Sequence, residues 1–379
     1  MAAEKKLTPF EAGMLVAGAG VGTGILAIPF ASTGLGIVQI AAAVIAAYAV
    51  STVLHLLVAD LVFLSSPSVQ LMEVFKKQLF RGNGGRIASR AFFVFLALVL
   101  LLNLTLYLTC AAEVMTDVFG MPGWAAKVVF YIAASLVVLP GLKVIGISEK
   151  YSMIIMFGVI VMLSVLAVGH TDGQVVLISG SIVRTTALYS LCMFSFSALF
   201  SVPQIAAGLH DKSKVKKCIL AGIGTNAAIT FVFTMIVLKV SPSVTKVATV
   251  GLSEVYGTGV KIACAVFVIL AMLTSFLSIS LAQLDIIHEE LKISRFLCWI
   301  SATLPVLLLA VILPFGYRSY IELVGGAVAI IIAVLILPAF RNAVRGVKRG
   351  LILGRYSHSK LLLPALFVFY IIMAVFSFV

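Results

Sequence analysis

The sequence predicts an all-α membrane protein with eleven spanning helices, and three observations carry this prediction. First, the 379 residues are 62% hydrophobic and 11% charged, whereas soluble domains average about 45–50% apolar and about 25% charged residues. Second, the apolar runs are long enough to cross a bilayer, which takes about 20 residues. Third, lysines and arginines gather in every second gap between these runs. We therefore expect a single transmembrane domain over residues 1–379.

Eleven segments qualify as membrane spans. They are residues 8–32, 35–64, 91–119, 123–140, 150–169, 182–209, 215–240, 259–287, 295–313, 320–340 and 360–378. Most basic residues fall in the gaps 5–6, 76–90, 143–150, 212–217, 292–295 and 341–360. Since basic loops stay on the cytoplasmic side, we expect a multi-pass protein of the cell membrane with its N-terminus cytoplasmic and, because the span count is odd, its C-terminus outside. In the gap at 69–80, apolar residues recur at helical spacing with lysines between them, which predicts a short amphipathic helix.

The net charge and the reactive residues argue against several function classes. The net charge of +13 comes mainly from residues between spans, so it indicates membrane orientation and not nucleic-acid binding. The five histidines are scattered without a metalloprotease spacing, so we expect no enzyme. The five cysteines lie in or beside apolar runs and are interpreted as core residues. The expected partners are a small molecule and the lipid bilayer, with no nucleic acid and no obligate protein partner.

A glycine-rich stretch interrupts the first span. Residues 18–24 contain four glycines, and each glycine weakens a helix by about 1 kcal/mol relative to alanine. An unwound backbone inside a membrane is tolerated only where protein buries it or a cavity wets it. Two interpretations stay open for this stretch alone: free amides and carbonyls that hold a charged ligand, or close helix packing through small residues.

The sixth span carries a second interruption, at residues 194–203. Its serines can bond to nearby backbone and loosen a helix, and Pro203 removes a backbone donor. The two interrupted spans are five apart, which is the pattern of two inverted five-helix repeats with a site between the broken helices. We place the repeats at about 8–170 and 180–340, with an extra helix at 360–378, and this pairing favours transport over packing.

Polar residues on other spans are candidates for holding an ion or a proton. Ala271, Thr274 and Ser275 share one face of the eighth span. Their stripe either packs tightly against a neighbouring helix or offers oxygen ligands to a hard cation. Glu113 on the third span and His55 on the second are ionisable residues inside the membrane, which makes them functional candidates; a satisfied packing role is the alternative for His55.

Four stretches resemble the aromatic and hydroxy amino acid permeases, which are close to the amino acid/auxin permeases. They are residues 16–29, Tyr107 with Glu113, residues 201–205, and Thr274-Ser275-Phe276-Leu277 with Leu281 and Asp285. These permeases belong to the amino acid–polyamine–organocation superfamily. The resemblance covers essentially the whole chain and implies a leucine-transporter-like fold of eleven helices, with a 5+5 inverted repeat and with helices 1 and 6 broken.

The resemblance also implies a function: a secondary active transporter that imports an amino acid by symport with a cation, through alternating access. A membrane amino-acid sensor, or an uncoupled facilitator or exchanger with the same fold, is the alternative. The implied substrate-binding residues are Gly20, Gly22, Thr23, Gly24, Tyr107, Phe194, Ser195, Phe196, Ser197 and Phe200. Amides of the first break would face the substrate carboxylate, while Phe196 and Phe200 would line its side-chain pocket. Ser197 and Leu199 stand where the family usually shows Gly and His, so the substrate side chain stays open.

The resemblance places a cation site where the first helix breaks against the eighth. The implied ligands are the carbonyls of Gly18, Val21 and Ala271 with the hydroxyls of Thr274 and Ser275. This set suits Na⁺ as the coupling ion. The alternative is a proton, with Glu113 or His55 as its carrier. We expect no other cofactor.

Overall fold

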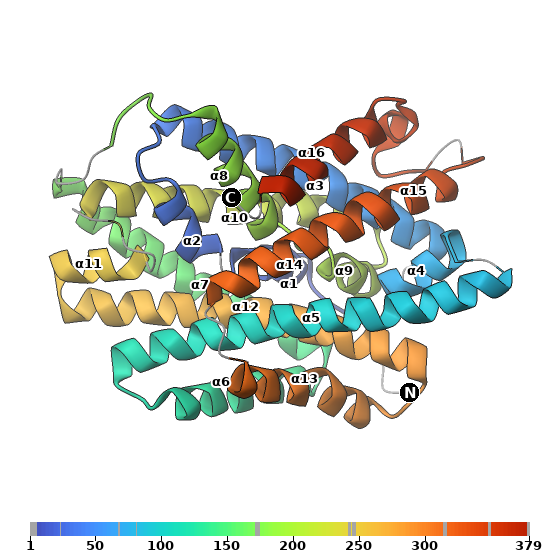
Figure 1. Cartoon of the computed structure of the whole chain (residues 1–379), viewed down its shortest axis with the longest axis horizontal. Coiled ribbons are helices and arrows are strands. Elements are labelled where there is room, and N and C mark those ends of the chain that lie inside the picture. Colours follow the sequence, from blue (N-terminus) through green and yellow to red (C-terminus); the bar gives the residue numbers. More distant parts are fainter. Residues whose placement is uncertain are drawn as a thin grey trace.

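The computed structural model describes residues 6–22, 24–66, 69–80, 82–170, 175–241, 244, 248–313, 317–347 and 350–376, and throughout these ranges the regular structure is helical. The long helices run side by side along the longest axis of the molecule (Figure 1). Seven of them are long and apolar enough to cross a membrane, and a bent pair near the N-terminus forms an eighth span. The chain is thus an integral, multi-pass membrane protein.

Every predicted span corresponds to a helix or to a broken helix. In the first half these are α1 (Pro9–Val21) with α2 (Gly24–Ala31), α3 (Ile37–Ser65), α5 (Gly82–Phe119), α6 (Gly123–Val138) and α7 (Leu142–Leu166). In the second half they are α8 (Ile182–Ser195) with α9 (Ser201–Leu209), α10 (Lys212–Val240), α12 (Thr258–Leu291), α13 (Arg295–Ile312), α14 (Tyr317–Ile331) with η2 (Ile332–Ile336) and α15 (Leu337–Ala343), and α16 (Leu362–Phe376). The short elements are α4 (Leu71–Gln78), η1 (Ala167–Gly169), α11 (Ala248–Tyr256) and η3 (Gly354–His358).

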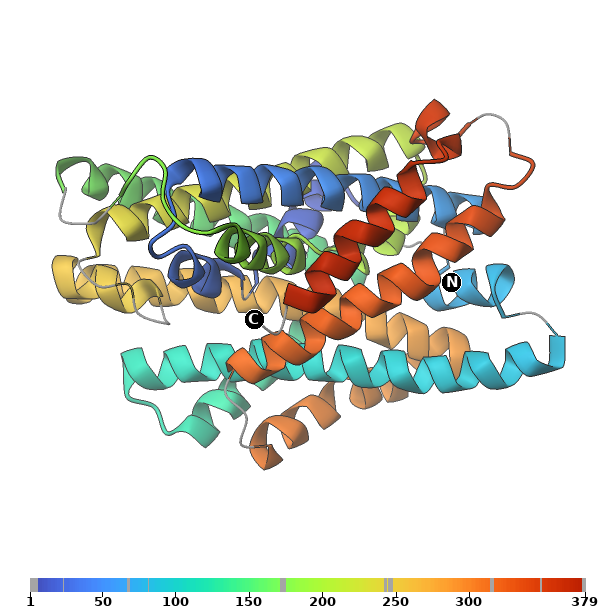
Figure 2. The same ribbon diagram turned by 45° about the horizontal axis from the view of Figure 1, so that its top comes forward.

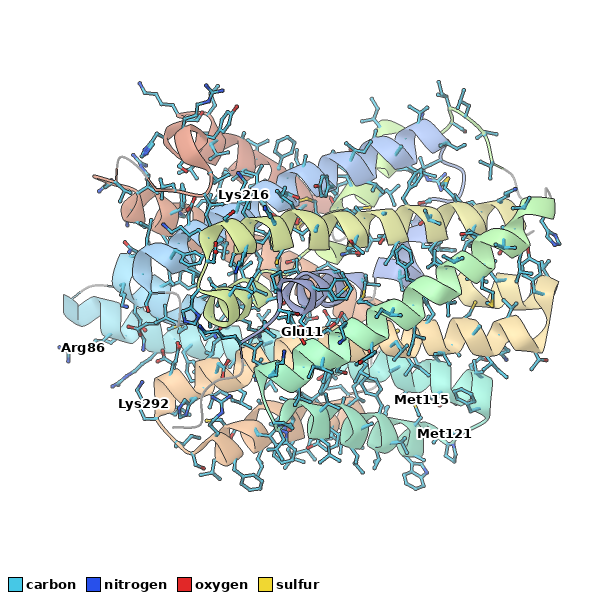
Figure 3. The ribbon with its side chains drawn as sticks, turned by 180° about the vertical axis from the view of Figure 1, so that it is seen from behind. Glu11, Arg86, Met115, Met121, Lys216 and Lys292 are labelled. Carbon is cyan, nitrogen blue, oxygen red and sulfur yellow. The ribbon has the colours of Figure 1, made fainter. Side chains whose placement is uncertain are left out.

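Helix α1 is the centre of the bundle. It packs against α7, α9, α10 and α12, and ten of its thirteen residues are buried. Thr8 and Glu11 form a capping box that starts the helix, which satisfies two backbone donors at its first turn. Glu11 also pairs with Lys143 at 2.6 Å, so the start of α1 is tied to the start of α7. The Glu11 side chain is buried, and Figure 3 labels it near the middle of the view.

The amphipathic segment predicted at 69–80 is confirmed as α4, which buries Leu71, Met72, Val74 and Phe75. It packs against α3, α5, α12 and α15. Helix α16 packs against α14 and α8 at the edge of the bundle, as Figures 1 and 2 both show. The inverted pairing of residues 8–170 with 180–340 stays a prediction.

Two span boundaries predicted from the sequence were wrong. Helix α7 begins at Leu142 and not at residue 150, and α5 begins at Gly82 and not at residue 91. Charged residues near the start of both helices, Lys143 and Glu149 in α7 and Arg86 and Arg90 in α5, resemble a polar gap in the sequence, although the backbone there is already helical. The shift places Glu149 two turns inside a span. Figure 3 shows Arg86 and Lys292 at one end of the bundle, away from Met115 and Met121, in keeping with the charge asymmetry of the gaps.

Candidate functional site

The first break separates α1 from α2 by an angle of 50°. Gly22 ends α1 with φ 8° and ψ −135°, outside the helical region. A Cβ at Gly22 would lie 2.7 Å from the Ser275 hydroxyl and 3.1 Å from the Tyr107 ring. A glycine is therefore needed here because two side chains approach its backbone directly.

The second break runs from residue 196 to residue 200, between α8 and α9. Side chains from neighbouring helices satisfy its exposed backbone. The Ser51 hydroxyl on α3 donates to the Phe196 carbonyl at 2.9 Å, and the Asn226 amide on α10 donates to the Ser195 carbonyl at 3.0 Å. Buried backbone groups require such partners, so α3 and α10 hold the unwound segment in place.

His55 is a further support of this segment. Its Nε2 accepts a hydrogen bond from the Ala198 amide at 2.8 Å, and its Nδ1 lies 2.6 Å from the Ser51 carbonyl. Because an amide can only donate, Nε2 must carry a lone pair and Nδ1 the proton, which defines a neutral imidazole. The side chain is fully buried. Both ring nitrogens of His55 therefore have partners in the structure, and the choice between a packing residue and a proton carrier stays a prediction.

A small cavity lies between the two breaks. The Ser195 hydroxyl donates to the Gly20 carbonyl at 3.2 Å across them. The lining residues are Ala19, Gly20, Gly22, Asn103, Tyr107, Phe194, Ser195, Ser197, Phe200, Ile279 and Val328. The centre of a water molecule can occupy a volume of about 20 Å³ in this cavity, so the cavity has room for about one water molecule. The cavity is too small for an amino acid, which enters only if its walls separate.

Seven of the ten predicted substrate residues line this cavity. Phe196 and Gly24 do not: the Phe196 ring is fully buried in the packing between helices, and the Gly24 backbone packs directly against the Ser195 side chain. Thr23 lies outside the described residues. Sequence reasoning left out Ala19, Asn103, Ile279 and Val328, of which only Asn103 had a signal, one turn before Tyr107 on the third span.

A cluster of oxygen atoms joins α1 to α12 beside the first break. The Thr274 hydroxyl lies 3.1 Å from the Gly18 carbonyl and 3.0 Å from the Ala271 carbonyl. The Ser275 hydroxyl lies 3.1 Å from the Gly18 carbonyl and 3.2 Å from that of Ala19. Four of the five predicted cation ligands therefore meet at one point, and the fifth, Val21, is buried further along α1.

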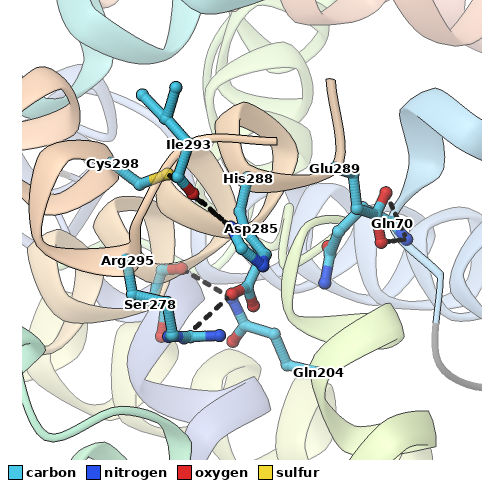
Figure 4. Close-up of polar contacts among 9 residues, drawn as sticks. All are labelled: Gln70, Gln204, Ser278, Asp285, His288, Glu289, Ile293, Arg295 and Cys298. Atoms are coloured by element: carbon cyan, nitrogen blue, oxygen red, sulfur yellow. Dashed lines mark hydrogen bonds and ion pairs between the residues drawn. The ribbon is translucent and has the colours of Figure 1, made fainter. Parts of the chain in front are cut away.

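Glu149 on α7 also belongs to this cluster and was not predicted from the sequence. Its side chain is fully buried, and its Oε1 accepts a hydrogen bond from the Ser278 hydroxyl at 3.1 Å. The Ser278 carbonyl in turn accepts from the Gln204 amide of α9 at 2.9 Å (Figure 4). Glu113, in contrast, is exposed on α5 and does not line the cavity.

Two adjacent broken helices around a small cavity, inside a bundle of spanning helices, define a secondary transporter with the leucine-transporter-like fold. The structure of MhsT in complex with L-phenylalanine superposes with a TM-score of 0.73 and 15% identity, covering 99% of this chain and 100% of that one. The structure of Mhp1, a nucleobase-cation-symport-1 family transporter in a closed conformation with bromovinylhydantoin bound, gives a TM-score of 0.69 and 12% identity, covering 99% and 91%.

The chain belongs to the tryptophan/tyrosine permease family, whose model matches residues 5–377. No curated protein sequence matches it. The protein is therefore a secondary amino-acid transporter and not an enzyme.

Proposed function

We propose that this permease imports a neutral amino acid by symport with a monovalent cation, through alternating access. The observation that carries the proposal is the small cavity shared by both breaks, with the Ser195 hydroxyl bound to the Gly20 carbonyl across it. Backbone groups of unwound helices can hold both charged groups of an amino acid. Separation of α8 and α9 from α1 opens the cavity. We place the N-terminus in the cytoplasm and the C-terminus outside, from the charge asymmetry of the gaps.

The lining supports an uncharged substrate side chain. Among the described residues that form the cavity, none is charged, and the apolar side chains are those of Ala19, Phe194, Phe200, Ile279 and Val328. The aromatic rings offer an apolar surface to a large side chain, and Asn103 and Tyr107 offer polar atoms. The family description and the L-phenylalanine bound by MhsT point the same way. We propose tryptophan, tyrosine or phenylalanine as the substrate, with Ser197 among the residues that choose between them.

The coupling ion in this proposal binds at the oxygen cluster of Gly18, Ala271, Thr274 and Ser275. Carbonyl and hydroxyl oxygens are the ligands that hard cations prefer. The cluster borders the cavity, because Ser275 reaches the Gly18 carbonyl and also packs on Gly22. Occupancy of one site therefore affects the backbone of the other.

Uptake of radiolabelled aromatic amino acids into liposomes with the purified protein tests the proposal. Accumulation above the outside concentration under an inward Na⁺ or pH gradient supports symport. Exchange of internal for external amino acid without accumulation under either gradient indicates an uncoupled exchanger, and binding without exchange indicates a sensor; either result would contradict the proposal.

A further inference from the structure

Glu149 lies at the point where α1, α7 and α12 meet. A Cβ at Gly18 would overlap its Oε2 and would lie 3.1 Å from its Cδ and 3.0 Å from the Thr274 Cβ. The carboxyl group therefore touches the backbone of α1 at the residue whose carbonyl accepts from Thr274 and Ser275. Because glycine has no side chain, Gly18 lets the Glu149 side chain from α7 come this close to the backbone of α1.

The carboxyl group is only half satisfied. Oε1 accepts from Ser278, whereas Oε2 is buried and has no hydrogen-bond partner in the part of the chain that the structure describes. The ion pairs found among these residues do not include Glu149, and the nearby Lys143 is paired with Glu11. A carboxylate inside a membrane is costly unless it is paired, so the Glu149 carboxyl group either carries a proton or pairs with a cation.

The surrounding atoms fit a metal cation. The Gly18 carbonyl, the Ala271 carbonyl and the two hydroxyls of Thr274 and Ser275 converge beside the carboxyl group. Each hydroxyl now donates its proton to a carbonyl, but a hydroxyl also carries two lone pairs and can turn one of them toward a cation. These four groups carry no net charge, whereas the Glu149 carboxylate adds a full negative charge to the set.

We propose that Glu149 is the anionic ligand of a sodium site completed by the Gly18 and Ala271 carbonyls and the hydroxyls of Thr274 and Ser275. This inference rests on the proposed function in one respect, namely that the sodium ion bound here drives amino-acid uptake. Binding neutralises the buried carboxylate and joins α7 to α1 and α12. Because Ser275 also contacts Gly22, the bound ion fixes the first break in the shape that the substrate meets.

The test measures Na⁺ binding without any amino acid. Thermal unfolding of the purified full-length protein is followed across a Na⁺ series, with choline replacing Na⁺ at constant ionic strength. A cation that binds only the folded state raises its stability with concentration. We expect Na⁺, but not choline, to raise the unfolding temperature. Glu149→Gln should raise the Na⁺ concentration for half of this effect by about tenfold or more, which corresponds to about 1.4 kcal/mol. The matched control is Glu113→Gln, the same change at the exposed carboxyl on α5, which should leave the Na⁺ series unchanged.

Three results would overturn the assignment: an unchanged Na⁺ midpoint in Glu149→Gln, an equal loss in Glu113→Gln, or no effect of Na⁺ on the wild-type protein. Glu149→Asp is the control for a general folding defect, because it changes the same position but keeps the negative charge. It should retain the Na⁺ effect on the unfolding temperature that Glu149→Gln loses. Amino-acid exchange in liposomes is measured in parallel. If amino acids exchange but Na⁺ does not change the unfolding temperature, the sodium site is wrong and the proposed transport function stands. If Na⁺ stabilises the protein but no amino acid exchanges, the sodium site stands and the proposed transport function is wrong.

Discussion

Replacing His55 with leucine removes the only side-chain acceptor that the structure gives to the Ala198 amide. The amide is then buried without a partner, which costs about 1–3 kcal/mol. We expect the unfolding temperature of the purified protein to fall by several degrees. Amino-acid uptake should fall further than stability does, because the α8–α9 break loses part of its support.

His55→Gln separates this structural role from proton transport. The glutamine amide oxygen reaches the position of Nε2 and can accept from Ala198, but it cannot carry a proton. If His55 supports the break, His55→Gln should keep most of the stability and uptake that His55→Leu loses, with an unchanged dependence of uptake on the pH gradient. Normal stability and uptake in His55→Leu would refute the structural role, and selective loss of pH-driven uptake in His55→Gln would establish a proton carrier instead.

Two further pairs of variants test the cavity. Phe196→Ala should lower the stability of the protein by about 3–5 kcal/mol, because it removes a fully buried ring, and should leave the order of preference among amino acids unchanged. Phe200→Ala changes a residue of the cavity wall and should change that order. Competition uptake assays measure the order of preference for both variants. The interpretation fails if the two variants behave alike. Gly24→Ala should impair folding or uptake because its Cβ would overlap the Ser195 side chain, and the second change Ser195→Gly should restore part of the loss. A Gly24→Ala protein with wild-type stability and uptake would show that α2 and α8 do not pack this closely.

The sequence predicted the elements whose physical signals are local. Long apolar runs and alternating basic gaps were enough to find each span, and the glycines of residues 18–24 and the serines around Phe196 were enough to find both breaks. The oxygen cluster followed from the resemblance, which paired Gly18 with Thr274 and Ser275, although these residues are more than 250 positions apart.

What the sequence left out depends on long-range packing. Glu149 stands beside Lys150 in a polar-looking stretch, and only the packing of α7 on α1 shows that it is buried. Phe196 and Phe200 look equivalent on the sequence, but the turn between α8 and α9 directs one ring into the packing and the other to the cavity. The three supports of the second break, Ser51, His55 and Asn226, come from α3 and α10 and share no motif with it.

The hydrogen bond from Ser278 to Glu149 has a kinetic consequence. It occupies Oε1 and leaves Oε2 without a hydrogen-bond partner among the described residues, so a cation at the proposed site would contact the carboxylate without breaking this hydrogen bond. The remaining adjustment is the rotation of two hydroxyl groups, Thr274 and Ser275, and side-chain rotations of this kind take about picoseconds to nanoseconds. Helix rearrangements take about microseconds to milliseconds. Local adjustment at the proposed site is therefore fast. Because Oε2 is buried, however, an ion can enter or leave only when the helices around the proposed site move, so helix movement sets the rate of ion exchange.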